Sequence, residues 1–350
     1  MYDFSKVVIT SSPHIKSKED TQSIMLDVLF ALIPSLAVST YVFGFRAILM
    51  TVVSVAACMV FEAIYDKIVG KPNTITDLSA AVTGVLLAFV CPVTLPYWML
   101  IIGDGVAIIV AKCLFGGLGK NFINPALAGR AFLLASWPVA MTTWVRAKSG
   151  VGLISNSTEA LDAMASATPL AIIKGTADGE LPSIANMFLG MCGGSMGEVS
   201  AIALIIGGVY LLVRKVITIH IPAAYILTVA VLTFLFPQGG LGHLDSMLYS
   251  LFGGGLMLGA FFMATDYSTS PVSRKGQVIF GIGCGLLTVM IRFFGGYPEA
   301  VSYKNGVIYS IISYRNTSGE YVYGFYENDR VVSAQTGNWI NYSKIVSLND

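Results

Sequence analysis

The sequence predicts an all-α polytopic membrane protein. We expect about nine transmembrane helices in two pseudo-symmetric inverted halves, followed by a short polar C-terminal tail. Three observations support this fold class. Of the 350 residues, 55% are hydrophobic and only 12% are charged, whereas soluble domains carry about 25% charged residues. Apolar runs recur at about the 20-residue length that a bilayer requires. One long polar interruption, roughly residues 144–182, separates five of these runs from four others.

Residues 1–20 form a polar N-terminal arm. The arm does not resemble a cleaved signal peptide, because the apolar run after it is long enough to be a full span. The first transmembrane half covers residues 21–144. Its expected spans are Ile24–Phe43, Ala47–Ile68, Leu78–Val93, Tyr97–Phe115 and Ile123–Trp144. The third of these is short enough to be a broken or half-length helix.

Residues 145–185 form a long loop, and residues 186–296 form the second transmembrane half. The spans expected in this half are Asn186–Val213, Ile219–Phe236, Ser246–Thr265 and Gln277–Phe294. Because an odd number of spans precedes the loop, the second half is inverted relative to the first, as an inverted repeat requires. Each half also has a glycine-rich step beside a polar cluster, around residues 115–125 and 253–271, although no clean residue-level repeat is visible.

The C-terminal tail, residues 297–350, is polar and rich in tyrosine. Two β-type runs, Val307–Tyr314 and Tyr321–Tyr326, flank Asn316–Gly319, a pattern typical of a β-hairpin. The tail is too polar to span a membrane, so we expect a small extramembrane segment.

The distribution of Lys and Arg predicts the orientation, because basic residues gather on cytoplasmic loops. If the N-terminus is cytoplasmic, that side holds Lys6, Lys16, Lys18, Lys67, Lys71, Lys112, Lys120, Arg214, Lys215, Arg274 and Lys275. The short outer connections then hold only Arg46, with Arg292 near the outer end of one span. The loop 145–185 is therefore expected on the external face.

Charge and ligand patterns exclude several functions. A formal net charge of +1 does not suit a nucleic-acid partner, which requires a basic face. The five cysteines occur singly and the three histidines are dispersed, so the chain does not encode an iron–sulfur or zinc site alone. It also lacks a nucleotide-binding fingerprint.

Ionisable residues inside apolar runs are costly and therefore functional candidates. Those within or at the end of a run are Asp27, Glu62, Asp104, Arg130, Glu198 and Asp266. For Asp27, Glu62 and Arg130 the simpler interpretation is a satisfied pair or an interfacial position. Asp104 lies between two glycines, and Asp266 precedes a run of hydroxyl residues. We expect these two aspartates to line an ion path.

Two polar stretches could hold a ligand. The run Ala165–Leu170 lies in the long loop and ends in Thr-Pro-Leu, although such residues are also ordinary in loops. The run Lys120–Ala126 places Asn121 and Asn124 at a helix start, where amides and free N–H groups suit an anion or a heteroaromatic edge. Simple capping by Asn124 is an alternative that needs no ligand.

Together these motifs resemble a known family, that of the D subunit of the Rnf electron-transport complex, which is related to the B subunit of the Na⁺-translocating NADH:quinone reductase. The matching pieces are Ser12–Ile15, Gly116–Ala126, Ala167–Leu170, Phe262–Pro271 and Gly295–Glu299. They occur in order over roughly residues 10–300. The family would add a further helix after the last of them, where this chain has its Tyr-rich tail.

The resemblance implies a covalent flavin. In the family, the threonine of a Ser-Gly-Ala-Thr motif carries FMN through a phosphoester, which makes Thr168 the expected attachment point. Here the motif reads Ala165-Ser166-Ala167-Thr168, so its first two positions differ. We assign Ser166, Ala167, Asn121, Asn124 and Thr265 to the surroundings of bound flavin. The resemblance leaves open a second, non-covalent flavin.

The function that the resemblance implies is a flavin-bearing electron-transfer subunit of a translocase, an ion-translocating ferredoxin:NAD⁺ oxidoreductase that moves Na⁺ or H⁺. Such a subunit is not active alone. Its partners would be other subunits, including an adjacent FMN-bearing subunit and iron–sulfur subunits, with lipid around them in a bacterial cytoplasmic (inner) membrane. The alternative from another class is a redox-free solute channel or permease built from inverted repeats.

Overall fold

A computed structural model describes residues 20–70, 74–145, 147, 168–174, 181–198 and 200–294, together with five short strands after residue 300. The chain divides into two units, Met1–Leu286 and Leu287–Asp350.

The first unit is helical. Before the long loop it contains α1 (Thr21–Phe43), α2 (Arg46–Val69), the 3₁₀ turn η2 (Ile75–Asp77), α3 (Ser79–Val90), α4 (Tyr97–Gly105), the π-helical segment η3 (Val106–Cys113), α5 (Pro125–Ser136) and α6 (Pro138–Thr142). After it come α8 (Pro169–Ile173), α9 (Ile184–Leu189), α10 (Ala201–Val213), α11 (His220–Leu235), α12 (His243–Phe252), α13 (Leu256–Leu258), the π-helical segment η4 (Gly259–Met263) and the start of α14 (Arg274–Phe294).

Membrane-spanning length is reached by three helices in the described part of the chain, namely α1, α2 and α14. A fourth candidate is the pair formed by α12 and the α13–η4 segment, which meet at a bend of 62°. Local sequence explains the helix ends: the Asp20 carboxylate accepts from the Ser23 amide at 3.1 Å at the start of α1, and Gly44 ends α1 at a φ of 82°. The length and apolar character of these helices confirm the helical membrane class.

Several predicted spans are interrupted in the structure. The run expected over 186–213 is divided into α9 and α10 by an irregular segment that begins at Gly190, where φ is 101°. The run expected over 246–265 breaks at Gly253–Gly255, and the run over 123–144 breaks at Trp137, just before Pro138. Hydropathy cannot detect these breaks, because glycine and proline change the backbone without making the run more polar.

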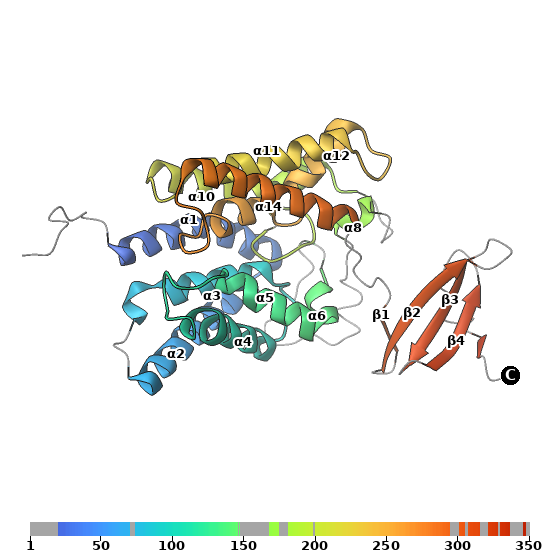
Figure 1. Cartoon of the computed structure of the whole chain (residues 1–350). Helices are drawn as coiled ribbons and strands as arrows, with labels where there is room; N and C mark the ends of the chain where they lie inside the picture. The colour runs from blue at the N-terminus through green and yellow to red at the C-terminus, as the bar shows by residue number, and fades with distance from the viewer. Residues whose placement is uncertain are drawn as a thin grey trace, which may run out of the picture. The chain divides into compact units, whose positions relative to one another are not determined.

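The helices pack around α1. Figure 1 shows α2, α3, α4 and α5 gathered on one side of α1, with α10, α11 and α12 on the other, and α1 packs directly against both α2 and α10. The centre of the bundle is α3, all of whose 12 residues are buried. Helices of this kind, apolar on every side and too short to span, are typical of the broken elements of membrane transporters.

An irregular segment, residues 191–198, enters the core beside the end of α3. Its backbone amides are satisfied there: the Met196 amide donates to the Cys91 carbonyl at 3.0 Å and the Gly197 amide to the Phe89 carbonyl at 2.9 Å. From α1, the Ser35 hydroxyl donates to the Gly197 carbonyl at 2.6 Å. A Cβ at Gly197 would overlap the Phe89 ring. Non-helical backbone is tolerated at this depth because its polar groups find protein partners.

The second unit contains the end of α14 and an antiparallel sheet in the order β1-β2-β3-β4-β5. Its strands are β1 (Val301–Lys304), β2 (Val307–Arg315), β3 (Tyr321–Glu327), β4 (Arg330–Thr336) and β5 (Val346–Ser347). β2 pairs with β3, with Arg315 opposite Tyr321. The two strands expected from the sequence overlap β2 and β3, and the expected turn Asn316–Gly319 lies outside the described residues.

Candidate functional site

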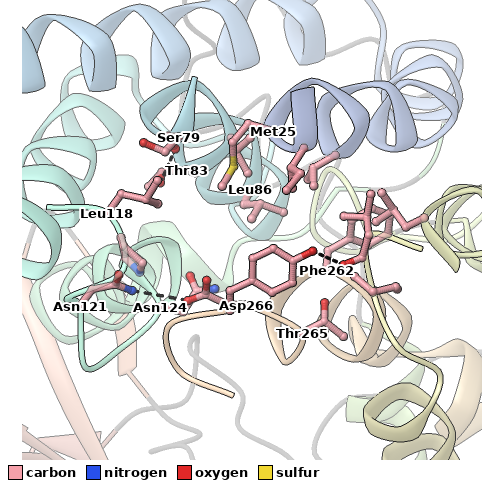
Figure 2. A pocket seen from close by; sticks show the side chains of 18 of the residues that line it. Met25, Ser79, Thr83, Leu86, Leu118, Asn121, Asn124, Phe262, Thr265 and Asp266 are labelled. Carbon is pink, nitrogen blue, oxygen red and sulfur yellow. Dashed lines mark hydrogen bonds between the residues drawn. The ribbon is translucent and has the colours of Figure 1, made fainter. Parts of the chain in front are cut away.

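Two cavities in the first unit contain most of the candidate residues. The first, which we call the amide cavity, encloses about 760 Å³ including the space at its open mouth. Its apolar wall comes from α1, α3 and η4 and includes Met25, Val28, Leu86, Phe261 and Phe262. Its polar lining consists of Ser79, Thr83, Lys112, Asn121, Asn124, Thr265 and Asp266. Figure 2 shows Asn121, Asn124 and Asp266 together at one end of this cavity.

The polar end of the amide cavity joins the two halves of the chain. The Asn121 amide donates to Asp266 Oδ2 at 3.4 Å and to the Ile123 carbonyl at 3.0 Å. The Asn124 amide reaches the Met263 carbonyl at 3.5 Å, while its oxygen caps α5 by accepting from the Ala126 amide at 3.0 Å. The capping interpretation of Asn124 is therefore confirmed, and its side chain still lines the cavity.

Asp266 itself is held by its own turn. Its Oδ2 accepts from the Ser268 hydroxyl at 3.0 Å and from the Thr269 hydroxyl at 3.2 Å. The Thr265 hydroxyl donates back to the Phe261 carbonyl at 2.7 Å. A carboxylate with this many donors is compensated without a cation, and its position is fixed for a ligand in the cavity.

A buried ion pair forms part of the wall of the same cavity. Lys112 Nζ lies 2.6 Å from Glu62 Oε1, and the two side chains are 3% and 2% exposed. Lys112 also donates to the Ser79 hydroxyl at 2.6 Å. This pair confirms the ion pair expected for Glu62, although Glu62 Oε2 is buried without a hydrogen-bond partner among the described residues. The sequence did not identify Lys112 as the partner.

The second cavity, which we call the threonine cavity, encloses about 620 Å³ including the space at its mouth. Thr168 and Trp144 line it, together with the glycine pairs 193–194 and 253–254 and with Gly255. Thr168 precedes α8 and accepts from the Ala171 amide at 3.3 Å through its Oγ1, with Pro169 as the first helical residue. Glycines give this cavity backbone walls, which leave room for a flat ligand.

An ion pair also lies in the threonine cavity. Arg130 Nη1, from α5, contacts Glu198 Oε1 at 3.3 Å, and their side chains are 31% and 9% exposed. Both residues line the cavity. Gly255 packs against this pair so closely that a Cβ at that position would overlap the Glu198 carboxylate. The pairing expected for Arg130 is confirmed, and it places a cation in the same cavity as Thr168.

The two aspartates expected to share an ion path are not brought together. Asp104 is fully buried in α4, where its Oδ1 accepts from the Ser54 hydroxyl at 2.6 Å and from the Cys58 thiol at 3.3 Å, both on α2. Its Oδ2 has no hydrogen-bond partner among the described residues. Asp104 lines neither of the two cavities.

The remaining candidates are structural or lie outside the described residues. Asp27 accepts from the Tyr210 hydroxyl at 2.8 Å and pairs with Arg214 at 3.0 Å, as expected for a satisfied intramembrane acid. Ser166 and Ala167 lie outside the described residues. The apolar wall of the amide cavity was not predicted, because no motif distinguishes Met25 or Leu86 from other apolar residues of the spans.

This geometry defines the class of protein: a helical membrane protein with buried polar cavities inside its bundle. Similarity to known proteins identifies the family. Residues 8–308 match the model of the NQR2, RnfD, RnfE family. The chain therefore belongs to this family, as the sequence motifs predicted.

Relatives that match most of the chain carry functional names. The D subunit of the Na(+)-translocating ferredoxin:NAD(+) oxidoreductase complex of Acetobacterium woodii is 48% identical over 85% of this chain and 89% of its own length. The D subunit of the proton-translocating ferredoxin:NAD(+) oxidoreductase complex of Clostridium ljungdahlii is 43% identical over 85% and 89%. The D subunit of the ion-translocating oxidoreductase complex of Alcanivorax borkumensis is 37% identical over 85% and 91%.

Proposed function

We propose that this protein is the membrane-embedded flavin subunit of an ion-translocating ferredoxin:NAD⁺ oxidoreductase complex. The observation that carries the proposal is the threonine cavity, in which Thr168 lies with Arg130 and Trp144. Family membership and the names of the relatives support the complex. The flavin is the cofactor that the resemblance to the family implies, and the residues of the cavity are compatible with it.

The threonine cavity fits FMN linked through its phosphate to Thr168. The capping bond to Ala171 uses a lone pair of Oγ1, so the O–H that a phosphoester would replace is not committed to the cap. The glycine-lined walls leave space for a planar ring, and Trp144 offers an aromatic face to pack against it. Bound flavin would supply one- and two-electron chemistry, while the protein contributes position and electrostatics.

The amide cavity fits a second, non-covalent flavin. Its lining combines apolar side chains with a few polar groups, as is typical of small-molecule sites. The amides of Asn121 and Asn124 and the carboxylate of Asp266 can hydrogen-bond the polar edge of a heteroaromatic ring, while Phe261 and Phe262 pack against its apolar part. Thr265 also lines the cavity and completes the set of cofactor residues expected there from the sequence.

The membrane orientation predicted from the basic residues assigns the two cavities to opposite faces of the membrane. The amide cavity includes Lys112, one of the residues expected on the cytoplasmic side, whereas Thr168 lies in the loop expected on the external side. Electrons would pass between flavins near opposite faces of a bacterial cytoplasmic membrane. Partner subunits, among them an FMN-bearing subunit and iron–sulfur subunits, would supply and remove them. The inverted halves would couple that transfer to movement of Na⁺ or H⁺. Asp266, which lines the amide cavity, and Asp104, which is buried apart from that cavity in α4, would lie at separate points of the ion path.

Covalent flavin is tested by in-gel fluorescence of the denatured protein under ultraviolet light, followed by mass spectrometry of the intact chain. Fluorescence and a mass increase of one FMN support the proposal. A colourless chain of unmodified mass contradicts covalent attachment. It would favour a redox-free channel or permease, a function consistent with the half-length helix α3 and the broken α12.

Orientation is tested by membrane-impermeant labelling of single cysteines on intact cells, in a background without the five native cysteines. Ser155→Cys should label and Ser273→Cys should not. The reverse pattern would overturn the orientation, since these positions lie on connections that the positive-inside rule assigns to opposite faces.

A further inference from the structure

Among the side chains that line the threonine cavity, Arg130 has the most hydrogen-bond donors to offer a ligand. A guanidinium carries five N–H donors and is always charged. Within the described residues, Arg130 uses one of its nitrogens, Nη1, in a single 3.3 Å contact to Glu198. Its side chain is 31% exposed and lines the cavity. Most N–H donors of the Arg130 guanidinium therefore have no hydrogen-bond partner among the described residues.

Two other arginines show what a structural arginine looks like in this bundle. Arg46 is buried and donates to the Val93, Thr94 and Leu95 carbonyls. Arg214 binds Asp27 through both Nε and Nη2, at 3.1 and 3.0 Å. Each of these uses its planar fork on the protein itself. Arg130 makes a single contact, of 3.3 Å, among the described residues.

The partner of Arg130 is more deeply buried than Arg130 itself. Glu198 is 9% exposed, and its carboxylate lies against Gly255, where φ is +70°. A side chain at position 255 would displace the carboxylate. Glu198 thus anchors one edge of the guanidinium in the cavity and leaves the rest of the fork for the space that Thr168 also lines.

We propose that Arg130 is the electrostatic determinant of the flavin at Thr168: it donates to the ring edge that becomes negative on reduction, and Glu198 holds it in position. This inference rests on the proposed function. One electron from a flavin or iron–sulfur carrier of the complex would add one negative charge to a flavin bound here, with no bond broken. The guanidinium of Arg130 would offset that charge in place of a proton. A phosphodiester at Thr168 would also carry one negative charge, so the redox potential of the ring is the measurement that separates a role of Arg130 at the ring from a role at the phosphate.

The test is redox titration of the covalent flavin in the purified protein, followed by its visible absorbance. Arg130→Gln should make the flavin roughly tenfold harder to reduce, a fall of about 59 mV for one electron. Arg130→Lys keeps the positive charge and should lower the redox potential of the flavin by a smaller amount. Glu198→Gln removes the neutralising charge and should shift the potential upward. Arg214→Gln, in the other partly exposed pair, is the control and should leave the potential unchanged.

The opposite signs expected for Arg130→Gln and Glu198→Gln separate an electrostatic role from a structural one, which would move both potentials in the same direction. Unchanged potentials, or shifts of the same sign, overturn the proposal. A lower yield of attached flavin with an unchanged potential also overturns it, because Arg130 would then serve the phosphate. A wild-type chain without flavin on Thr168 refutes the proposed function and this inference together. Flavin present with an unmoved potential refutes only the inference.

Discussion

Each cavity is lined by an ion-paired cation, Lys112 in the amide cavity and Arg130 in the threonine cavity, and the two ion pairs differ in exposure. Lys112 and Glu62, at the amide cavity, are 3% and 2% exposed and 2.6 Å apart, whereas Arg130 and Glu198, at the threonine cavity, are 31% and 9% exposed and 3.3 Å apart. Lys112 is also bound by the Ser79 hydroxyl. A pair that is fully enclosed holds together the helices around it. A pair that is open on one side can exchange a contact with the protein for one with a ligand.

Ligand recognition also differs between the cavities. The amide cavity presents neutral amides and a carboxylate held by hydroxyls, which suits reversible binding of an uncharged ring edge. The threonine cavity presents a hydroxyl and a cation, which suits a tethered, anionic cofactor. Four experiments test this contrast, ordered from the largest expected effect to the smallest.

Thr168→Ala should abolish covalent flavin and leave the protein inserted and folded. Only the hydroxyl can accept the phosphoester, and α8, which it caps, is a five-residue helix. Denatured-gel fluorescence and intact mass measure the loss.

Two variants control for the lost cap. Ser183→Ala removes the similar cap of α9, where the Ser183 hydroxyl accepts from the Asn186 amide, and should keep the flavin. Thr168→Ser retains an acceptor and should restore attachment. Peptide mapping that locates flavin phosphate on Ser166 or Thr176 would refute the assignment.

Lys112→Ala should be the most destabilising change at either ion pair. It leaves the Glu62 carboxylate buried and uncompensated, and breaking such a pair costs about 3–5 kcal/mol. Thermal unfolding in detergent measures the effect, with Lys120→Ala, an exposed lysine, as control. Replacing both Lys112 and Glu62 by Met should cost less than the single change. An unfolding temperature equal to that of Lys120→Ala would show that this pair contributes no stability.

Asn121→Leu should weaken retention of the non-covalent flavin about tenfold, since loss of a hydrogen bond to a buried polar group costs about 1–3 kcal/mol. The flavin at Thr168 should be unaffected. Flavin released by acid precipitation is quantified against the amount that stays with the protein. Asn186→Ala, at an exposed amide on α9, is the control. Full retention of the non-covalent flavin in Asn121→Leu would show that this flavin does not bind in the amide cavity.

Asp266→Asn, and to a smaller extent Asp104→Asn, should lower the number of ions moved per electron in the assembled complex and keep the flavin at Thr168. Asp266 lines the open amide cavity, where an ion can reach it, whereas Asp104 is fully buried and its Oδ2 has no hydrogen-bond partner among the described residues. Ion uptake by vesicles, normalised to electron transfer, is the measurement. An unchanged number of ions moved per electron in the double variant would show that both aspartates have only a structural role.

Features that depend on local composition were predicted best from the sequence. The bounds of α1 and α2 agree with the predicted spans within a few residues, because a continuous apolar run has few alternatives in a bilayer. The breaks at Gly190 and Gly253–Gly255 within apolar runs could not be placed, nor could the pairing of Arg130 with Glu198, 68 positions apart. Such contacts depend on tertiary packing, which a single sequence does not encode as a motif.

The separation of Asp104 from Asp266 could not be predicted for the same reason. Both lie beside glycines or hydroxyl residues, and the residue pattern carries no information on which helix faces each carboxylate. In the structure Asp104 contacts α2, and Asp266 contacts Asn121.

The π-helical segments η3 and η4 have a consequence for how this chain can vary. In η3 the Leu114 amide donates to the Ile109 carbonyl, and in η4 the Ala264 amide donates to the Gly259 carbonyl, five residues back in each case. Such a turn accommodates one residue more than an α-helical turn. Deleting a single residue from 106–113 would restore the α-helix and leave the residues on either side facing much as they do now, whereas the same deletion in a regular α-helix rotates them by about 100° relative to each other. Asp104 would then keep its contact with Ser54, so these segments should tolerate the loss of one residue far better than the regular helices of the bundle.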